Sequence, residues 1–322
     1  MADIEDRVTV NMICSTLNAL CGVPGNLLIL KFYTKDGFGE ISAHHLCIVH
    51  LAIADFIACL FGEIWDVYQY INFNVVEQMP NIMTWIFGLF YLIMFVGTSA
   101  SGGILLIMAY DRFSKITKPL QRDHNTNRKI NKMTIACYVI AFIGIFPSDL
   151  FVDDRNLELA LNSISYIIGV FSLVVAPIFG NIWFYFKIKR YLIRQVGDVN
   201  VSQQQRRRRQ RNETAVKTLK WLTVFMLICV AGPKIFISII FATFITGKKS
   251  FRNGIVTDSM AIKILFLISN NLLYINNAVN VFVYYKTMKE FRNWIKSQFG
   301  FHQRRNASSQ QQQQESQLAF LR

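Results

Sequence analysis

The chain has 322 residues, of which 52% are hydrophobic and only 17% are charged. Soluble globular domains carry about 25% charged residues, so this composition argues against a soluble domain and indicates a membrane protein. The formal net charge of +14 does not indicate nucleic-acid binding, because the basic residues lie in alternate gaps between apolar runs. We therefore expect the lipid bilayer, and no nucleic acid, among the partners.

Apolar runs of about 20 residues are long enough to cross a bilayer as helices. Seven such runs are present, within residues 8–33, 45–70, 83–115, 131–150, 159–190, 214–246 and 258–286. We therefore predict an all-α membrane protein, with a seven-transmembrane helix bundle over residues 8–286. Residues 1–7 are expected to form a short extracellular N-terminus.

The gaps after the first, third and fifth runs hold most of the lysine and arginine, whereas the other gaps lean acidic. The last exterior gap is an exception, with Lys248, Lys249 and Arg252. Basic loops stay on the cytoplasmic side, so we expect the N-terminus outside and the C-terminus inside. The basic stretch 195–213, between the fifth and sixth runs, is expected to be a flexible cytoplasmic loop.

The end of the chain has two different patterns. Residues 287–299 place Phe291 and Trp294 on one helical face, with Arg292 and Lys296 elsewhere, which predicts an amphipathic helix in the membrane interface. Residues 300–322 are rich in glutamine, which predicts a disordered cytoplasmic tail. The six cysteines show no metal-type spacing, and we expect no disulfide framework.

Several polar side chains fall inside the apolar runs, and a charged group at that depth is costly. Asp55, in LAIADF, must therefore face the interior of the bundle. One interpretation is a protonated carboxyl that hydrogen-bonds for packing. The other is a carboxylate among hydroxyl and amide oxygens, which suits a hard cation such as Na⁺. The candidate ligands of an allosteric Na⁺ are Asp55, Ser101, Asn276 and Asn280. We expect no other cofactor.

The stretch LLIMAYDRFSKITKPL places Asp111 and Arg112 side by side where the third apolar run ends. Taken by itself, such a pair is also explained by a purely structural role, in which it anchors the end of a helix. Other motifs accompany it, in order and on successive runs: Gly25-Asn26, Leu51 to Asp55, Pro177 with Tyr185, Pro233, and Asn276-x-x-x-Asn280-x-x-x-Tyr284. Together these motifs resemble those of rhodopsin-like (class A) G-protein-coupled receptors, over nearly the whole chain.

The resemblance implies a plasma-membrane receptor that binds an extracellular ligand and activates a heterotrimeric G protein when the sixth span moves. It implies that Asp111 and Glu213 hold Arg112 in the resting state and release it on activation. The residues it assigns to this switch are Asp111, Arg112, Phe113, Pro119, Leu120, Tyr185, Glu213, Asn280 and Tyr284. An enzyme is not expected.

The chain departs from the family pattern at several positions. Val281 replaces the proline of the seventh span, and Ala231 stands where a tryptophan is usual in the sixth. Phe87 lies near the place of the usual exterior cysteine, so the family disulfide is expected to be absent. These departures place the chain among divergent, orphan-type members.

The candidate ligand pocket consists of Glu63, Asp66, Met94, Phe95, Thr98, Lys234, Asn270 and Tyr274. Met94 occupies the place of the aspartate of amine receptors, and Tyr274 that of the retinal-binding lysine, so neither ligand class is favoured. A pocket with both signs of charge fits a short peptide or a zwitterionic small molecule. Two roles for Lys234 are equally compatible with the sequence: it binds a carboxylate of the ligand, or it forms a salt bridge with Glu63.

Three other functions are weighed against the receptor. A transporter needs a relay of ionisable groups, and only Asp55 and Lys234 lie deep. A membrane enzyme needs a histidine or carboxylate cluster, and the five histidines do not form one. A receptor-like protein that does not signal stays open because of Ala231 and Val281.

Overall fold

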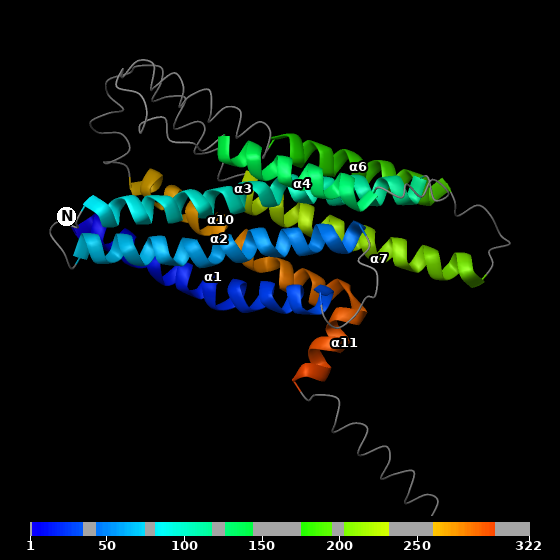
Figure 1. The fold of residues 1–322 in the computed structure, drawn as a ribbon, viewed down its shortest axis with the longest axis horizontal. Helices are drawn as coiled ribbons and strands as arrows, with labels where there is room; N and C mark the ends of the chain where they lie inside the picture. Colours follow the sequence, from blue (N-terminus) through cyan, green and yellow to red (C-terminus); the bar gives the residue numbers. More distant parts are fainter. Residues whose placement is uncertain are drawn as a thin grey trace, which may run out of the picture.

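The computed structural model describes residues 2–34, 43–74, 81–117, 126–143, 175–194, 203–231 and 260–299. Within these ranges the regular structure is helical. The elements are α1 (Ala2–Thr34), α2 (Ala43–Asn74), α3 (Asn81–Thr117), α4 (Thr126–Ile143), α6 (Ala176–Arg194), α7 (Gln203–Met226), the π-helical turn η4 (Leu227–Ala231), α10 (Met260–Thr287) and α11 (Lys289–Gln298). The long helices run side by side as a bundle, and α11 turns away from it at the end opposite the start of α1 (Figure 1).

Each predicted span contains a described helix. Three of them are long and apolar enough to cross a membrane on their own, over Thr9–Thr34, Ala43–Ile71 and Trp85–Thr117. The segments α4, α6, α7 with η4, and α10 cover parts of the other four spans. α10 continues through Val281 without a break, as expected for a span that lacks the family proline.

Two helices begin earlier than the apolar pattern indicated. α1 starts at Ala2, before the apolar run begins. α7 starts at Gln203, so the prediction of a flexible loop was wrong for residues 203–213. Glutamine and arginine are good helix formers, and this stretch holds neither glycine nor proline, so the helix continues beyond the apolar run.

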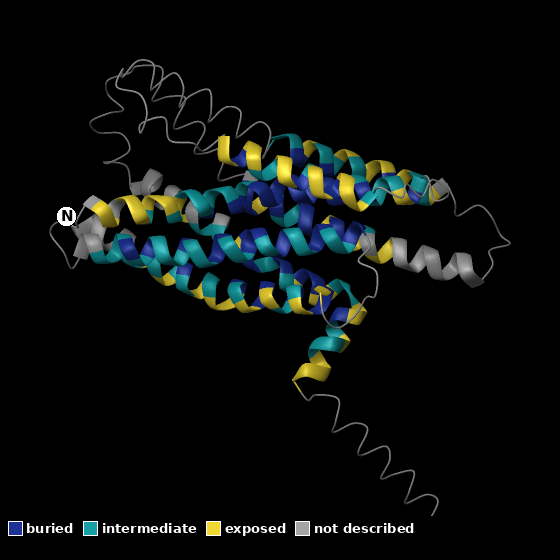
Figure 2. Cartoon of the chain, in the orientation of Figure 1, coloured by how far each residue is buried: buried dark blue, intermediate teal, exposed yellow. Residues whose placement is uncertain are grey.

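Burial follows the inward faces of the helices, whereas exposed side chains follow the outer faces (Figure 2). The outer faces are themselves apolar, with Leu20 66% and Ile135 58% exposed. Large exposed apolar surfaces of this kind are characteristic of protein in contact with lipid. The exposed fractions therefore fit a bundle that lies in a bilayer.

The amphipathic end helix packs against the first span. Phe291 is fully buried, and its ring centroid lies 5.3 Å from that of Phe32 in α1. Trp294 also lies 5.3 Å from Phe32, and the Lys31 ammonium stands 5.8 Å from the Trp294 ring. The apolar face of α11 is therefore fixed by α1, and its charged side chains lie on the other face.

α2 and α3 approach each other closely at Gly97. A Cβ atom on this residue would lie 2.8 Å from the backbone oxygen of Ala54, which is too close for any side chain. Gly88, nearer the start of α3, has nothing within 4 Å of such an atom. The glycine at 97 thus sets the distance between the two helices.

Gly97→Ala is expected to lower the unfolding temperature of the purified protein, because overpacking costs about 1–3 kcal/mol. Gly88→Ala is the matched control and is expected to raise it slightly, because alanine is about 1 kcal/mol better than glycine in a helix. Thermal unfolding in detergent measures both. Equal shifts in the two variants would contradict the close approach.

Candidate functional site

Asp111, near the end of α3 that lies on the α11 side of the bundle, is 3% exposed. Its carboxylate accepts a hydrogen bond from Lys115 Nζ at 2.9 Å, one helical turn further on. Asp111 also interacts electrostatically with the neighbouring Arg112, the partner that the family resemblance implies. Residues four apart share a helix face whereas neighbours point in different directions, so Lys115 is the better placed.

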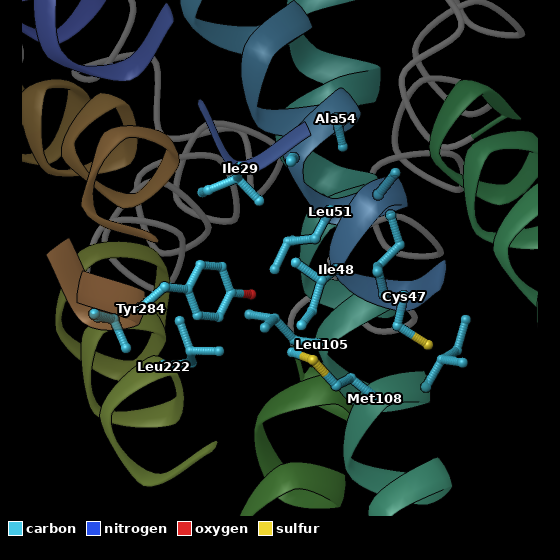
Figure 3. Packing of buried hydrophobic residues seen from close by; sticks show 14 of the residues in the cluster. Ile29, Cys47, Ile48, Leu51, Ala54, Leu105, Met108, Leu222 and Tyr284 are labelled. Atoms are coloured by element: carbon cyan, nitrogen blue, oxygen red, sulfur yellow. The ribbon is translucent and has the colours of Figure 1, made fainter. Parts of the chain in front are cut away.

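Arg112 lies among three other helices. Tyr33 of α1, Cys47 of α2 and Tyr284 of α10 are close enough to interact with its guanidinium electrostatically. The Arg112 Nε atom and the Tyr284 hydroxyl are buried without a hydrogen-bond partner among the described residues. Figure 3 shows the Tyr284 ring pointing into the cluster of buried apolar side chains. Buried polar groups left unpaired cost about 1–3 kcal/mol each, so this arrangement favours any partner that can satisfy them.

The predicted second partner of Arg112, Glu213, has an exposed side chain on α7. Its role as a resting-state partner stays a prediction. Two other contacts tie α7 to α10 at this end. The Thr218 hydroxyl donates to Thr287 Oγ1 at 2.8 Å, and the Lys286 ammonium stands 4.9 Å from the Trp221 ring.

Phe113 and Tyr185 occupy the contact between α3 and α6. The Phe113 ring lies 5.3 Å from Phe184, within a small cluster in which Ile116 of α3, Ile188 of α6 and Leu219 of α7 are buried. Tyr185 is half-buried on α6. Pro119 and Leu120 lie outside the described residues.

Asp55 is fully buried at the centre of the bundle and accepts a hydrogen bond from the Asn280 amide. Its other carboxylate oxygen has no donor within the described ranges, and the same holds for the side-chain oxygens of Asn26 and Asn277. Partnerless buried oxygens of this kind suit either a proton or a hard cation. The free oxygen of Asp55 is therefore open to a proton or to a cation such as Na⁺.

The other predicted Na⁺ ligands are buried in the same region. Ser101 donates to the Thr98 backbone oxygen at 2.9 Å, and Asn276 is 5% exposed. Thr98, predicted for the ligand pocket, accepts from Asn277 Nδ2 at 3.2 Å. Asn26 donates to the Asn277 backbone oxygen at 3.0 Å, so the polar groups of α1, α3 and α10 are joined.

The sequence analysis did not identify Asn277 as part of this polar cluster. Asn277 follows Asn276 directly within an apolar run, and the sequence does not show which of these two amides faces α3.

The predicted pocket residues on α2 lie toward the end of the bundle where α1 begins. Glu63 accepts a hydrogen bond from the Thr16 hydroxyl of α1 at 2.7 Å. Asp66 is 4% exposed, with Ser15 and Tyr274 within hydrogen-bonding reach.

Met94 and Tyr274 both contact Gly62, where a Cβ atom would lie 3.3 Å from the Met94 sulfur and 3.0 Å from the Tyr274 ring. The structure thus brings Glu63, Asp66, Met94 and Tyr274 together. Phe95 packs beside them, with its ring 4.6 Å from Tyr91. Lys234 and the side chain of Asn270 lie outside the described residues.

An aromatic seam joins α2 and α3 toward the end of the bundle where α1 begins. Tyr68 stacks on Phe87 at 4.1 Å, Trp65 lies 4.7 Å from Tyr91, and Phe61 lies 5.3 Å from Phe90. The six cysteines are free in the structure. The aromatic pairs hold this end of α2 against α3.

Comparison with known proteins assigns the family. The sequence model of the 7 transmembrane receptor (rhodopsin family) matches residues 25–284. Platelet-activating factor receptors of Capra hircus and Bos taurus are each 25% identical over 160 residues, which are 48% of this chain and 44% of the receptor. The C5a anaphylatoxin chemotactic receptor 1 of Danio rerio is 25% identical over 157 residues, 46% of this chain and 40% of that receptor.

The matched part thus spans less than half the length of these curated relatives. The family match confirms both the resemblance seen in the motifs and the seven-span helix bundle with a short helix after it, and it identifies a membrane receptor and not an enzyme. The chain belongs to the rhodopsin family of seven-transmembrane receptors.

Proposed function

We propose that this protein is a plasma-membrane receptor that binds an extracellular ligand and activates a heterotrimeric G protein through outward movement of α7. The end of the bundle where α1 begins faces outside, and the end that carries α11 faces the cytoplasm. The observation that carries the proposal is the buried Arg112, which interacts with Tyr284 of α10 and has a partnerless Nε, as the Tyr284 hydroxyl is also partnerless among the described residues. A protein that docks at this end can supply the missing partners.

In the resting state α7 is held to α10 by contacts of modest strength. The hydrogen bond from Thr218 to Thr287 contributes about 0.5–1.5 kcal/mol. The contact of Lys286 with Trp221 contributes about 0.5–1 kcal/mol where it is exposed. A ligand that favours the active state by about 1–3 kcal/mol is comparable in free energy with these two polar contacts.

The movement of α7 exposes the surface around Arg112 and Tyr284 to the G protein. Arg112 and Tyr284 then turn their unpaired polar groups toward the G protein, while Phe113 stays packed on α6. Pro119 and Leu120, which follow α3, add an apolar contact for the same partner. Tyr185 on α6 and Glu213 on α7 change partners as the helices separate.

The pocket chemistry favours a short peptide or a zwitterionic small molecule. The relatives are named for two different ligands, platelet-activating factor and C5a anaphylatoxin, so the argument rests on the pocket itself. Glu63 and Asp66 supply negative charge and Lys234 positive charge, with Phe95 and Tyr274 as aromatic surface. Asn270 adds an amide on α10.

Na⁺ is the proposed allosteric ion. Asp55 would hold it, with Ser101, Asn276 and Asn280 as further oxygen donors, and its positive charge would neutralise the buried carboxylate. Asp55 also accepts the hydrogen bond of Asn280 and so links α2 to α10 whether or not the ion is bound. The ion is proposed to fit only the distance between α2 and α10 in the resting state. It therefore stabilises that state and lowers the basal G-protein activation.

Arg112→Ala is expected to reduce ligand-free G-protein activation to background, because it removes the group that meets the G protein. The measurement compares cells that express wild type and variant at matched surface levels. Arg128→Ala, an exposed arginine on α4, is the control and keeps the wild-type signal. Full signalling by Arg112→Ala would exclude the proposed mechanism, and a flat signal in every variant would favour a receptor-like protein that does not signal.

Thr218→Val is expected to raise basal activation about two- to tenfold, because it removes a hydrogen bond of roughly 0.5–1.5 kcal/mol from the resting state. Thr223→Val is the matched control, since the Thr223 hydroxyl bonds to the Leu219 backbone oxygen of its own helix at 2.8 Å. The same cellular assay measures both. A basal signal that rises equally in the two variants would show that the α7–α10 tie is not the restraint.

Asp55→Asn is expected to remove the sodium sensitivity of the receptor. Basal activation in isolated membranes is measured in NaCl and in KCl at equal ionic strength. Wild type gives a lower signal in NaCl, and Asp55→Asn gives the same signal in both salts. Sodium dependence that survives in the variant would contradict the assignment.

A further inference from the structure

Two acids on α2 each have a buried carboxylate oxygen with no hydrogen-bond partner among the described side chains. These atoms are Oε2 of Glu63 and Oδ2 of Asp66. The residues are three apart, so they lie on the same face of α2. Asp66 is 4% exposed, and in the described ranges neither acid forms an ion pair with a lysine, arginine or histidine.

The two acids lie where α1, α2 and α10 meet. Thr16 of α1 donates to the other oxygen of Glu63, while Ser15 of α1 and Tyr274 of α10 approach Asp66. Asp66 is 11 residues beyond Asp55 along α2, or about 16 Å at 1.5 Å per residue. The apolar span ends at Ile71, so the acids lie close to the extracellular end of the proposed receptor.

Aromatic rings line the same place. Tyr91 of α3 interacts electrostatically with Asp66, and its ring lies 4.7 Å from Trp65 and 4.6 Å from Phe95. Carboxylates beside aromatic faces bind organic cations well, because the rings attract positive charge and the carboxylates accept hydrogen bonds. A bare metal ion uses the oxygens but gains little from the rings.

We propose that Glu63 and Asp66 bind a cationic organic group of the ligand, a guanidinium or an ammonium. This inference rests on the proposed ligand-binding function and narrows it to ligands that carry a basic group. A guanidinium has five N–H donors, enough to satisfy both partnerless oxygens at once. The α1 hydroxyls of Ser15 and Thr16 orient the two carboxylates and belong to the same site.

The test uses the purified full-length receptor in lipid nanodiscs and two probes of nearly the same shape. Arginine amide carries the guanidinium, and citrulline amide replaces it with an uncharged urea group. Arginine amide is expected to raise the unfolding temperature at millimolar concentration, and citrulline amide is expected to have no effect. Asp66→Asn and Glu63→Gln should each weaken the response to arginine amide at least tenfold.

Two further variants keep the result interpretable if a substitution disturbs folding. Asp66→Glu retains the charge and should retain most of the response. Glu290→Gln removes an exposed acid on α11, at the other end of the bundle, and should respond as wild type does. The thermal midpoint without probe shows whether each variant is folded.

Several outcomes would overturn the inference. An equal shift with both probes, or no shift with either, shows that the site does not select a cation. A shift that appears only in Lys234→Gln shows that the chain's own lysine occupies the site. A shift with calcium chloride that needs the same two acids and exceeds that with arginine amide shows a metal site.

The measurement with arginine amide and citrulline amide does not depend on signalling. The cationic site and the proposed receptor function can therefore be contradicted independently of each other. A receptor that activates a G protein through Arg112 but does not distinguish the two amides keeps the proposed function and loses the cationic site. A protein that binds arginine amide through Asp66 but never activates a G protein keeps the site and loses the proposed function.

Discussion

The hydrogen bond between Asp55 and Asn280 is the contact on which the rest of the arrangement depends. In a bilayer no water can satisfy polar groups at this depth, so the two helices must supply partners for each other. The bond fixes α2 at Asp55 against α10 at Asn280, about two turns before the end of α10. Toward one end of this helix pair lie the acids Glu63 and Asp66, and toward the other lies Tyr284, which interacts with Arg112 of α3. Both candidate sites therefore include residues of this helix pair.

A helix pair joined in this way does not transmit a signal by itself. Coupling between two sites needs an element with two arrangements, and binding at either site must favour one arrangement over the other. α7 has the properties of that element. Among the described residues, a hydrogen bond and a cation–π contact join it to α10, its buried Leu222 and Met226 pack in the same core as Tyr284, and its other end passes into the π-helical turn η4. π turns are frequent at functional sites, and this one ends at Ala231, where the family usually has a tryptophan.

The sequence predicted the number and order of the helices, since seven long apolar runs leave little choice in a membrane. It also predicted the buried polar centre, because Asp55 and Asn280 are conspicuous within apolar surroundings. It did not predict the ion pair of Asp111 with Lys115, which depends on two residues four apart sharing a helix face. Hydroxyls such as that of Thr16 were not identifiable, since they also bond their own backbone; this one lies 2.8 Å from the Met12 oxygen as well as near Glu63.

The aromatic seam joins α2 and α3 at the proposed ligand end through several separate ring contacts. Each ring pair contributes about 0.5–1.5 kcal/mol beyond its buried area. Unlike a covalent bond, they can separate and reform one pair at a time. Trp65 and Tyr91 of the seam also border Asp66, so a cation that enters there contacts the rings that hold the helices together. Ligand binding and the packing of α2 on α3 are then properties of the same side chains.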